Sequence, residues 1–220
     1  MSSATPNSDS DAANTEPDRL DRIFESDDAA ALERRYDQWA ETYDDDHDGW
    51  GWAGPEVVAA TILRLGDLAE TATIHDAGCG TGKAGVALRR AGFRGRIVGL
   101  DLSQGMLDVA ATTEAYDELV KCSLTELPLD DDTTDGVVSS GVFTHGHVGG
   151  DAFAELCRIT RPDGLVTVTQ PVELQTAFQP FADALQSDGR WTELERTTPE
   201  SLHPDRDAVP QSVVTWRIGS

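Results

Sequence analysis

Three glycines at alternate positions, following a carboxylate, are the residues of this chain best suited to binding chemistry. The stretch from Asp76 to Gly82 reads DAGCGTG and lies between a short apolar run and an amphipathic segment. Glycine lets the backbone bend tightly and approach a ligand closely, because no Cβ intervenes. The pattern predicts a strand, a glycine-rich turn and a helix that together hold a small molecule.

The neighbouring residues exclude two common glycine-rich loops. A dinucleotide-binding G-x-G-x-x-G turn needs a glycine where Lys83 stands, and a P-loop needs a serine or threonine at the next position. The loop instead places the Asp76 carboxylate beside the ligand, which suits a ligand with an ammonium group and no phosphate. S-adenosylmethionine (SAM) is such a ligand. We expect Asp76 to hold its ammonium group, directly or through water, and Gly78, Cys79 and Gly80 to lie along its methionine part.

A second carboxylate ends the next predicted strand. Asp101 closes an apolar run that begins at Arg96, about 20 residues after the glycine-rich turn. In doubly wound sheets an acid at this distance hydrogen-bonds the ribose hydroxyls of the ligand. We therefore expect Asp101 to bind the ribose and Leu102 and Met106 to flank the adenine. Ser103 is well suited to cap the helix that follows.

Together these residues resemble the class I SAM-dependent methyltransferases. Further matches to that superfamily lie at Leu127-Pro128, at 134–138 (TDGVV) and at 158–164 (RITRPDG). Within it, residues 36–44 (YDQWAETYD) and 140–149 (SGVFTHGHVG) resemble the methyltransferase-like family of the Williams–Beuren chromosomal region. The resemblance runs from about Ala31 to the C-terminus. It implies a Rossmann-like, doubly wound, seven-stranded, mostly parallel sheet whose last strand is inserted antiparallel.

The resemblance also implies contacts after the third and fourth strands. Where the superfamily has an acid and a small residue at the adenine, this chain has Ser123, which could accept a hydrogen bond, and Leu124, whose amide could reach the ring. Ser140 begins the stretch where enzymes that methylate nucleic-acid amines carry an Asn-Pro-Pro-aromatic motif, so that acceptor is disfavoured. His145 lies just beyond. Because imidazole titrates near neutrality, His145 is either a general base or a histidine that orders the loop.

The composition is strongly acidic. The 220 residues include 40 Asp and Glu against 17 Lys and Arg, a formal net charge of −23, and only Lys83 and Lys121 are lysines. Such a balance suits a protein that stays hydrated in concentrated salt, so we expect a halophilic protein. A disordered acidic chain is the alternative, which the 39% of hydrophobic residues in patterned blocks opposes. Nucleic acid is an unfavoured partner, because phosphate binding needs basic patches.

Other sequence features point to a cytoplasmic protein without metal or membrane. Cys79, Cys122 and Cys157 lack C-x-x-C spacing, as is typical of reduced thiols. No apolar run reaches about 18 residues and no hydrophobic signal core begins the chain, so neither a membrane span nor secretion is expected. The pair of histidines at 145 and 147 has no third ligand at a motif spacing, so no metal site is expected.

Periodicity and turn residues predict the elements that position these groups. The composition predicts a disordered acidic tail over residues 1–26 and one folded domain over residues 27–220. A helix over 28–43 carries Leu32, Tyr36, Trp39 and Tyr43 in one stripe and is predicted to be a lid, with Tyr36 or Tyr43 facing the methionine end of SAM. Residues 44–46 and 49–52 predict a loop. Further helices are predicted over 55–65, 82–91, 103–114, 150–160 and 175–186, and strands over 73–77, 96–101, 118–123, 135–140, 164–170, 191–196 and 213–218.

The sequence therefore predicts a SAM-dependent methyltransferase that acts on a small molecule. Methyl transfer needs little beyond alignment of nucleophile, methyl group and sulfur, so the lack of a catalytic triad does not oppose an enzyme. Two alternatives remain at this point: a SAM-binding protein without turnover, and a nicotinamide-dependent oxidoreductase, which Lys83 disfavours. The acceptor and the oligomeric state are not determined by the sequence.

Overall fold

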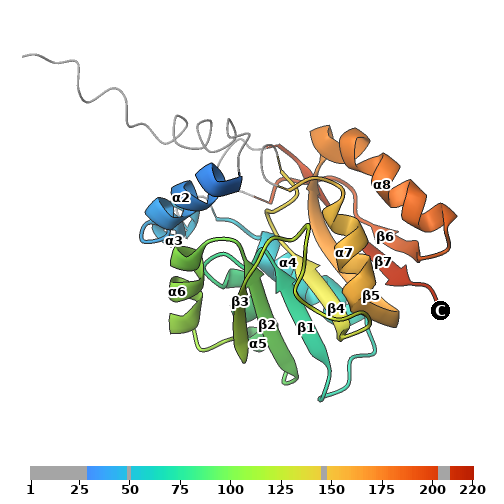
Figure 1. The fold of residues 1–220 in the computed structure, drawn as a ribbon, viewed down its shortest axis with the longest axis horizontal. Coiled ribbons are helices and arrows are strands. Elements are labelled where there is room, and N and C mark those ends of the chain that lie inside the picture. The colour runs from blue at the N-terminus through green and yellow to red at the C-terminus, as the bar shows by residue number, and fades with distance from the viewer. Residues whose placement is uncertain (1–28, 49–50, 145–147, 203–208) are drawn as a thin grey trace, which may run out of the picture.

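Seven strands form one sheet in the computed structural model, which describes residues 29–48, 51–144, 148–202 and 209–220. The predicted tail and His145 lie outside these ranges. Helices cover both faces of the sheet, with α7 and α8 in front and α4 and α5 behind in the view of Figure 1. The predicted Rossmann-like methyltransferase fold is thus confirmed.

The strand order places a topological switch point between β1 and β4. The sheet runs β3-β2-β1-β4-β5-β7-β6, with β1 to β5 parallel and β7 antiparallel to both neighbours. Ligands bind beyond the carboxyl ends of parallel strands at such a point. The strands are β1 Thr73–Ala77, β2 Arg96–Asp101, β3 Glu118–Lys121, β4 Thr134–Ser139, β5 Thr160–Pro171, β6 Trp191–Arg196 and β7 Gln211–Ile218.

The helices bury apolar stripes against the two faces of this sheet. One core cluster joins α4 and α5 to β1 and β2 through residues such as Ile62, Leu88 and Ile97. The other joins α7 and α8 to the sheet through Phe153, Phe178 and other large side chains. The helices are α2 Ala29–Trp39, α3 Tyr43–Asp48, α4 Gly54–Leu65, α5 Lys83–Arg90, α6 Gln104–Thr112, α7 Ala152–Ile159 and α8 Gln175–Ser187, with a 3₁₀ turn η2 at Val172–Leu174.

The prediction of one continuous helix over 28–43 is wrong. Helix α2 ends at Trp39, the chain turns through 40–42, and α3 then includes residues 44–46, for which a loop was expected. The Thr42 amide bonds the Trp39 carbonyl at 3.0 Å, which closes the turn. Tertiary contacts override the local helical preference here. The turn sets the Tyr43 ring edge-on to Trp39, with 4.7 Å between ring centroids, and brings Asp44 to the glycine-rich loop.

Candidate active site

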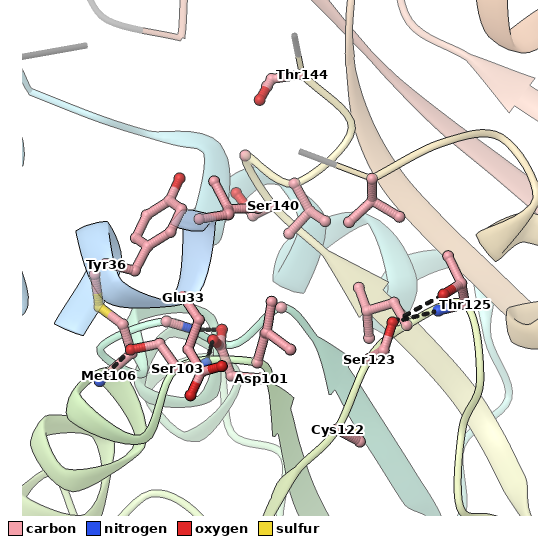
Figure 2. A pocket seen from close by; sticks show the side chains of 18 of the residues that line it. Glu33, Tyr36, Asp101, Ser103, Met106, Cys122, Ser123, Thr125, Ser140 and Thr144 are labelled. Atoms are coloured by element: carbon pink, nitrogen blue, oxygen red, sulfur yellow. Dashed lines mark hydrogen bonds between the residues drawn. The ribbon is translucent and has the colours of Figure 1, made fainter. Parts of the chain in front are cut away.

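The carboxyl ends of β1, β2 and β4 and the connection after β3 surround a cavity of about 530 Å³ (Figure 2). This volume lies within the range of small-molecule and cofactor sites. In the view of Figure 2, Tyr36 and Asp101 lie on one side of the cavity and Ser123 and Thr125 on the other. Most of the residues predicted to bind the cofactor line it, namely Tyr36, Tyr43, Gly78, Gly80, Asp101, Leu102, Met106, Ser123, Leu124 and Ser140.

Two glycines of the loop after β1 have backbone conformations that favour glycine over any residue with a side chain. Gly78 has φ +73°, and a Cβ there would lie 2.2 Å from a methyl carbon of Val142. Gly80 has φ +53°, and a Cβ there would meet no atom within 4 Å, so this backbone faces open space. Both lie in the left-handed region that favours glycine. The loop can therefore bring its backbone against a bound ligand.

Asp101 is placed at the cavity by two backbone hydrogen bonds. Its Oδ2 accepts from the Gly80 amide at 2.8 Å and its Oδ1 from the Ser103 amide at 2.9 Å. Each carboxylate oxygen has a further lone pair, so both can still accept a hydrogen bond from a ribose hydroxyl. Burial raises the pKa of Asp101, while these two amides and that of Leu102 oppose the rise by stabilising its charge.

Asp76 and Cys79 line a smaller cavity of about 30 Å³ rather than the main one. Tyr43, Gly78, Gly80 and Ser140 line both cavities. Asp76 is 1% exposed, and its Oδ1 and the Ser140 Oγ are buried without a hydrogen-bond partner in the described part of the chain. Such orphaned acceptors are costly unless a bound group satisfies them. The arrangement therefore fits an ammonium group, which donates three hydrogen bonds.

The electrostatics of the smaller cavity depend on its burial. Burial raises the pKa of Asp76 to about 7, opposed by a hydrogen bond from Tyr116 and reinforced by the charge of Asp101. Burial also raises the pKa of the Cys79 thiol, which therefore stays protonated at neutral pH. A ligand with a positive charge would stabilise the ionised form of Asp76.

The start of α6 and the connection after β3, where the sequence predicts the adenine contacts, form one side of the main cavity. Ser103 caps α6 as predicted, since its Oγ accepts from the Met106 amide at 3.1 Å. The Ser123 Oγ lies 2.8 Å from the Thr125 Oγ1 and accepts from the Thr125 amide at 3.3 Å. Ser123 retains capacity for one further hydrogen bond to a ligand.

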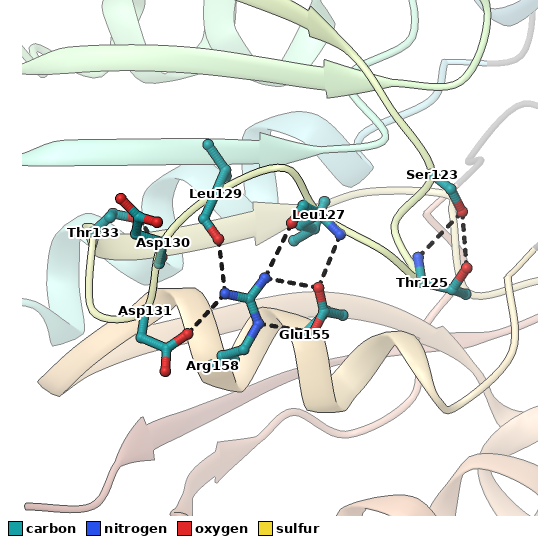
Figure 3. A network of polar contacts seen from close by, with 9 residues as sticks. All are labelled: Ser123, Thr125, Leu127, Leu129, Asp130, Asp131, Thr133, Glu155 and Arg158. Carbon is teal, nitrogen blue, oxygen red and sulfur yellow. Dashed lines mark hydrogen bonds and ion pairs between the residues drawn. The ribbon is translucent and has the colours of Figure 1, made fainter.

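A polar network from α7 holds the second half of that connection (Figure 3). Arg158 donates to the carbonyls of Leu127 at 3.1 Å and Leu129 at 2.7 Å, and to Asp131 at 2.8 Å. Glu155 pairs with Arg158 and accepts from the Leu127 amide at 2.8 Å. The sequence reasoning placed Arg158 in a family motif without a role. The structure shows that it supports the segment that lines the cavity.

Helix α2 packs against α6, and α3 lies beside α2 (Figure 1). Each of the two helices contributes a tyrosine ring to the cavity lining. Leu32 and Trp39 form a small buried cluster, against which Tyr36 and Tyr43 pack. The rings of Tyr36 and Tyr43 lie 6.4 Å apart. Burial is the main cause that raises the pKa of both tyrosines, so both stay neutral. The stripe read from the sequence therefore serves both the packing of the helices and the wall of the cavity.

Three carboxylates of α2 and α3 make polar contacts with the elements that surround the two cavities. Glu33 of α2 pairs with Lys121, the last residue of β3, at 2.7 Å. Asp37 accepts from the Ser103 hydroxyl at 2.6 Å and from the Gly105 amide at 2.9 Å.

The third carboxylate, Asp44, contacts the glycine-rich loop and α5. It accepts from the Thr81 hydroxyl at 2.6 Å and lies 3.4 Å from the Lys83 ammonium. Both lysines of the chain are thus paired with this N-terminal segment. Sequence reasoning missed all three carboxylates, because no local pattern marks an acid whose partner lies far along the chain.

Several residues of the cavity lining belong to stretches that the sequence matched to the family, without a predicted role for each residue. Many follow β4, where the sequence placed the acceptor, and Asp151 precedes α7. His145 itself lies outside the described residues. The lining residues not predicted individually are Leu32, Glu33, Ser103, Cys122, Thr125, Gly141, Val142, Thr144, Val148, Gly149 and Asp151.

The described residues offer neither a metal site nor a membrane-spanning helix. No group of three or more His, Cys, Asp or Glu side chains in these ranges could hold a metal ion. No helix in the described ranges is both long and apolar enough to cross a bilayer.

Comparisons with known proteins identify the family of this chain. A family model described as a methyltransferase domain matches residues 75–168. The chain is 32% identical over 190 residues to Methyltransferase-like protein 27 of Homo sapiens, and this alignment covers 83% of this chain and 76% of that protein. It is 36% identical over 109 residues to Malonyl-[acyl-carrier protein] O-methyltransferase of Serratia marcescens, covering 50% of this chain and 42% of that one.

Solved structures share the fold at lower identity. A putative methyltransferase solved in complex with the Haloferax volcanii Trm112 methyltransferase activator matches with a TM-score of 0.65 and 19% identity, over 86% of this chain and 97% of that chain. A putative SAM-dependent methyltransferase of Methanococcus maripaludis matches with a TM-score of 0.61 and 18% identity, over 86% and 93%.

The relatives and the matched domain favour methyl transfer over both alternatives, the nicotinamide-dependent oxidoreductase and the SAM-binding protein without turnover. The cofactor of this family is SAM. The extent of the similarity to Methyltransferase-like protein 27, together with the fold, shows that the chain belongs to the class I SAM-dependent methyltransferases.

Proposed function

We propose that this methyltransferase acts on a small-molecule acceptor in the cytoplasm. The observation that carries the proposal is the cavity of about 530 Å³, whose lining continues past the cofactor residues along the connection after β4. There Gly141, Val142, Thr144 and Val148 offer small or apolar surface beside the methionine end of the site. Such a lining suits a compact, partly apolar acceptor.

The residues of the chain supply binding, orientation and exclusion of water. When bound, SAM supplies a methyl group activated by a positively charged sulfur. We assign Asp101 to the ribose hydroxyls, Asp76 and Ser140 to the ammonium group, and Leu102, Met106, Ser123 and Leu124 to the adenine. Gly78, Cys79 and Gly80 lie along the methionine part. Residues after β4 would then lie beside the methyl group of a bound SAM and could orient a nucleophile toward it.

A general base at His145 stays a prediction. It is needed only if the acceptor must lose a proton before it attacks the methyl group. Metal-independent transfer is proposed, because alignment alone accounts for most of the required catalysis.

Nucleic acid is a less favoured acceptor on electrostatic grounds. The formal net charge is −23, and Lys83 and Lys121, the only lysines, pair with Asp44 and Glu33. Binding a phosphate backbone requires basic groups that displace counterions. The described lining of the main cavity contains no lysine or arginine, and the smaller cavity has only Lys83.

The acceptor class can be tested with methyl-labelled SAM. We would incubate the protein with labelled SAM and a cell extract separated into small-molecule, nucleic-acid and protein fractions. We expect S-adenosylhomocysteine together with a labelled metabolite in the small-molecule fraction. The Asp101→Ala variant provides the control for background labelling. Label confined to the nucleic-acid or protein fraction would contradict the proposal.

We propose further that α2 and α3 form a lid that closes over the cofactor. Its contacts with the domain are mostly polar, through Glu33, Asp37 and Asp44, and its aromatic cluster is separate from the two main core clusters. Few buried apolar contacts permit local opening at low cost. Tyr36 and Tyr43 would then face the methionine end and exclude water when the lid is closed.

The lid predicts a specific effect of Asp44→Ala. This change removes the contacts to Thr81 and Lys83. Each contact stabilises the closed lid by no more than about 1.5 kcal/mol. We expect SAM affinity by calorimetry to fall about threefold to tenfold, and hydrogen exchange over 30–45 to accelerate. Asp45→Ala, at the exposed neighbouring position, is the matched control. Equal exchange and affinity in the two variants would contradict the lid.

The acidic composition supports a halophilic protein, as the sequence predicts. Like-charge repulsion at a net charge of −23 destabilises the folded chain in dilute buffer, and salt screens it. We expect the melting temperature to rise by at least about 4 °C between dilute buffer and molar KCl, a shift that corresponds to about 1 kcal/mol. Sucrose at equal osmolarity, which does not screen charge, is the control. A flat or falling melting temperature in KCl would refute the prediction.

A further inference from the structure

Tyr116, which sequence reasoning did not single out, occupies a slot made by glycines of three segments. A Cβ on Gly85 would lie 2.4 Å from its Cζ and 2.6 Å from its Oη. A Cβ on Gly82 or Gly99 would each lie 3.0 Å from the ring. Side chains at these positions would push the ring out of place. The glycines in and near the loop after β1 therefore also make room for the Tyr116 ring.

The Tyr116 hydroxyl has a single possible direction for its proton. Its oxygen accepts from the Gly85 amide at 3.1 Å and lies 2.6 Å from Asp76 Oδ2. Since the amide supplies one hydrogen, the hydroxyl must donate its own to the carboxylate. This bond engages Oδ2 and leaves Oδ1 without a partner in the described residues, on a carboxylate that lines the smaller cavity.

The charge on Asp76 depends on few neighbours. Tyr116 is the described side chain that donates a hydrogen bond to it. The backbone amide of Gly85 also favours its ionised form, whereas the nearby carboxylate of Asp101 disfavours ionisation. A hydrogen bond to the charged form lowers a carboxyl pKa. Titratable groups face this carboxylate from four further segments, namely Tyr43 of α3, Cys79 of the loop, Lys83 of α5 and Asp101 of β2.

We propose that Tyr116 is a positioning residue, which orients the Asp76 carboxylate and stabilises its negative charge so that Oδ1 can accept a hydrogen bond from the ammonium group of SAM. The inference rests on the assignment of that ammonium group to Asp76 under the proposed function. Tyr116 itself touches no reacting atom.

The sign of the pH dependence follows from the raised pKa of Asp76, about 7. The ionised carboxylate binds the ammonium group, so SAM affinity should increase as the pH rises through about 7. Removing the Tyr116 hydroxyl should raise the pKa of Asp76 further. The variant then needs a higher pH than the wild type to reach full affinity.

The test compares Tyr116→Phe with the wild type by SAM calorimetry from about pH 6 to about pH 9. Phenylalanine keeps the ring in its slot. We expect the variant to bind about tenfold more weakly below about pH 7, a loss typical of one hydrogen bond to a charged group. The ratio of the two affinities should approach one toward about pH 9. Titration of the cofactor amine is common to both proteins and cancels in this ratio.

Two further variants separate the possible failures. Asp76→Asn should weaken binding about tenfold or more near neutral pH and abolish the extra effect of Tyr116→Phe in the double variant. Thr215→Val removes a buried hydroxyl that lies 3.1 Å from Thr167, far along β7, and should leave the affinity ratio at one at every pH.

The outcomes are distinct. Unchanged affinity in Asp76→Asn would overturn the ammonium assignment and with it the present inference. Loss in Asp76→Asn but none in Tyr116→Phe would overturn the positioning role alone. A loss in Tyr116→Phe that is equal at every pH would reduce Tyr116 to a structural residue. A pH-dependent ratio that disappears in the Asp76→Asn background would support the proposal.

Discussion

Replacing Asp101 by alanine is expected to weaken SAM binding by about a hundredfold. The carboxylate can accept both ribose hydroxyls, and hydrogen bonds to a charged group contribute about 1.5–3 kcal/mol each, where about 1.4 kcal/mol is tenfold in affinity. The same carboxylate also holds the amides of Gly80 and Ser103 at 2.8 and 2.9 Å. Its loss therefore removes a ligand contact and loosens the loop that shapes the site.

Isothermal calorimetry with SAM measures this loss. Asp108→Ala is the matched control, since Asp108 lies on the exposed side of α6 and accepts a hydrogen bond from the Gln104 side chain at 2.8 Å. We expect it to bind SAM as the wild type does. Near-UV circular dichroism would establish that both variants are folded. An Asp101→Ala protein that is folded and binds SAM normally would disprove the ribose assignment.

Trp216→Ala is expected to destabilise the fold by about 3 to 5 kcal/mol. Trp216 is 1% exposed and stacks on Trp191, with 4.6 Å between ring centroids and 10° between planes. Phe153 of α7 packs against it with a centroid distance of 5.5 Å. Truncation therefore leaves a large cavity between α7 and the antiparallel end of the sheet, which rigid neighbours cannot fill.

Urea unfolding in molar salt measures this free energy of unfolding. Leu194→Ala on the adjacent strand β6 is the control, because Leu194 is 41% exposed and its truncation removes little buried surface. We expect it to change stability by less than about 0.5 kcal/mol. A Trp216→Ala protein as stable as Leu194→Ala would show that the stacked pair is not part of the cooperative core.

The fold could be predicted because its signals are local. Short apolar runs separated by amphipathic helices predict a parallel sheet, and the glycine-rich turn and Asp101 mark the ends of two of its strands. Parallel strands bring their carboxyl ends to one edge, so residues after different strands meet there without further information. The family resemblance added the strand order, including β7 between β5 and β6, which the structure confirms.

The division of the N-terminal segment could not be predicted in this way. Residues from Ala29 to Tyr43 contain no glycine or proline, so local preference favours one helix. Two contacts stabilise the turn after Trp39. The ring of Tyr43 packs against Trp39, and Asp44 accepts a hydrogen bond from Thr81, 37 positions along the chain. Contacts of this range outweigh small differences in helix propensity.

The sequence by itself determined the class of sheet, the glycine-rich loop after β1 and the carboxylate at the end of β2, because each depends on residue type and short spacing. Only the tertiary structure decided which polar groups face one another. Tyr116 reaches Asp76 across 40 positions, and Arg158 reaches Leu127 across 31. Periodicity tells which face of an element is buried, but it holds no information about the partner of a side chain. That partner is set by how the elements pack, because packing brings segments that are distant in sequence to within a few ångströms of one another.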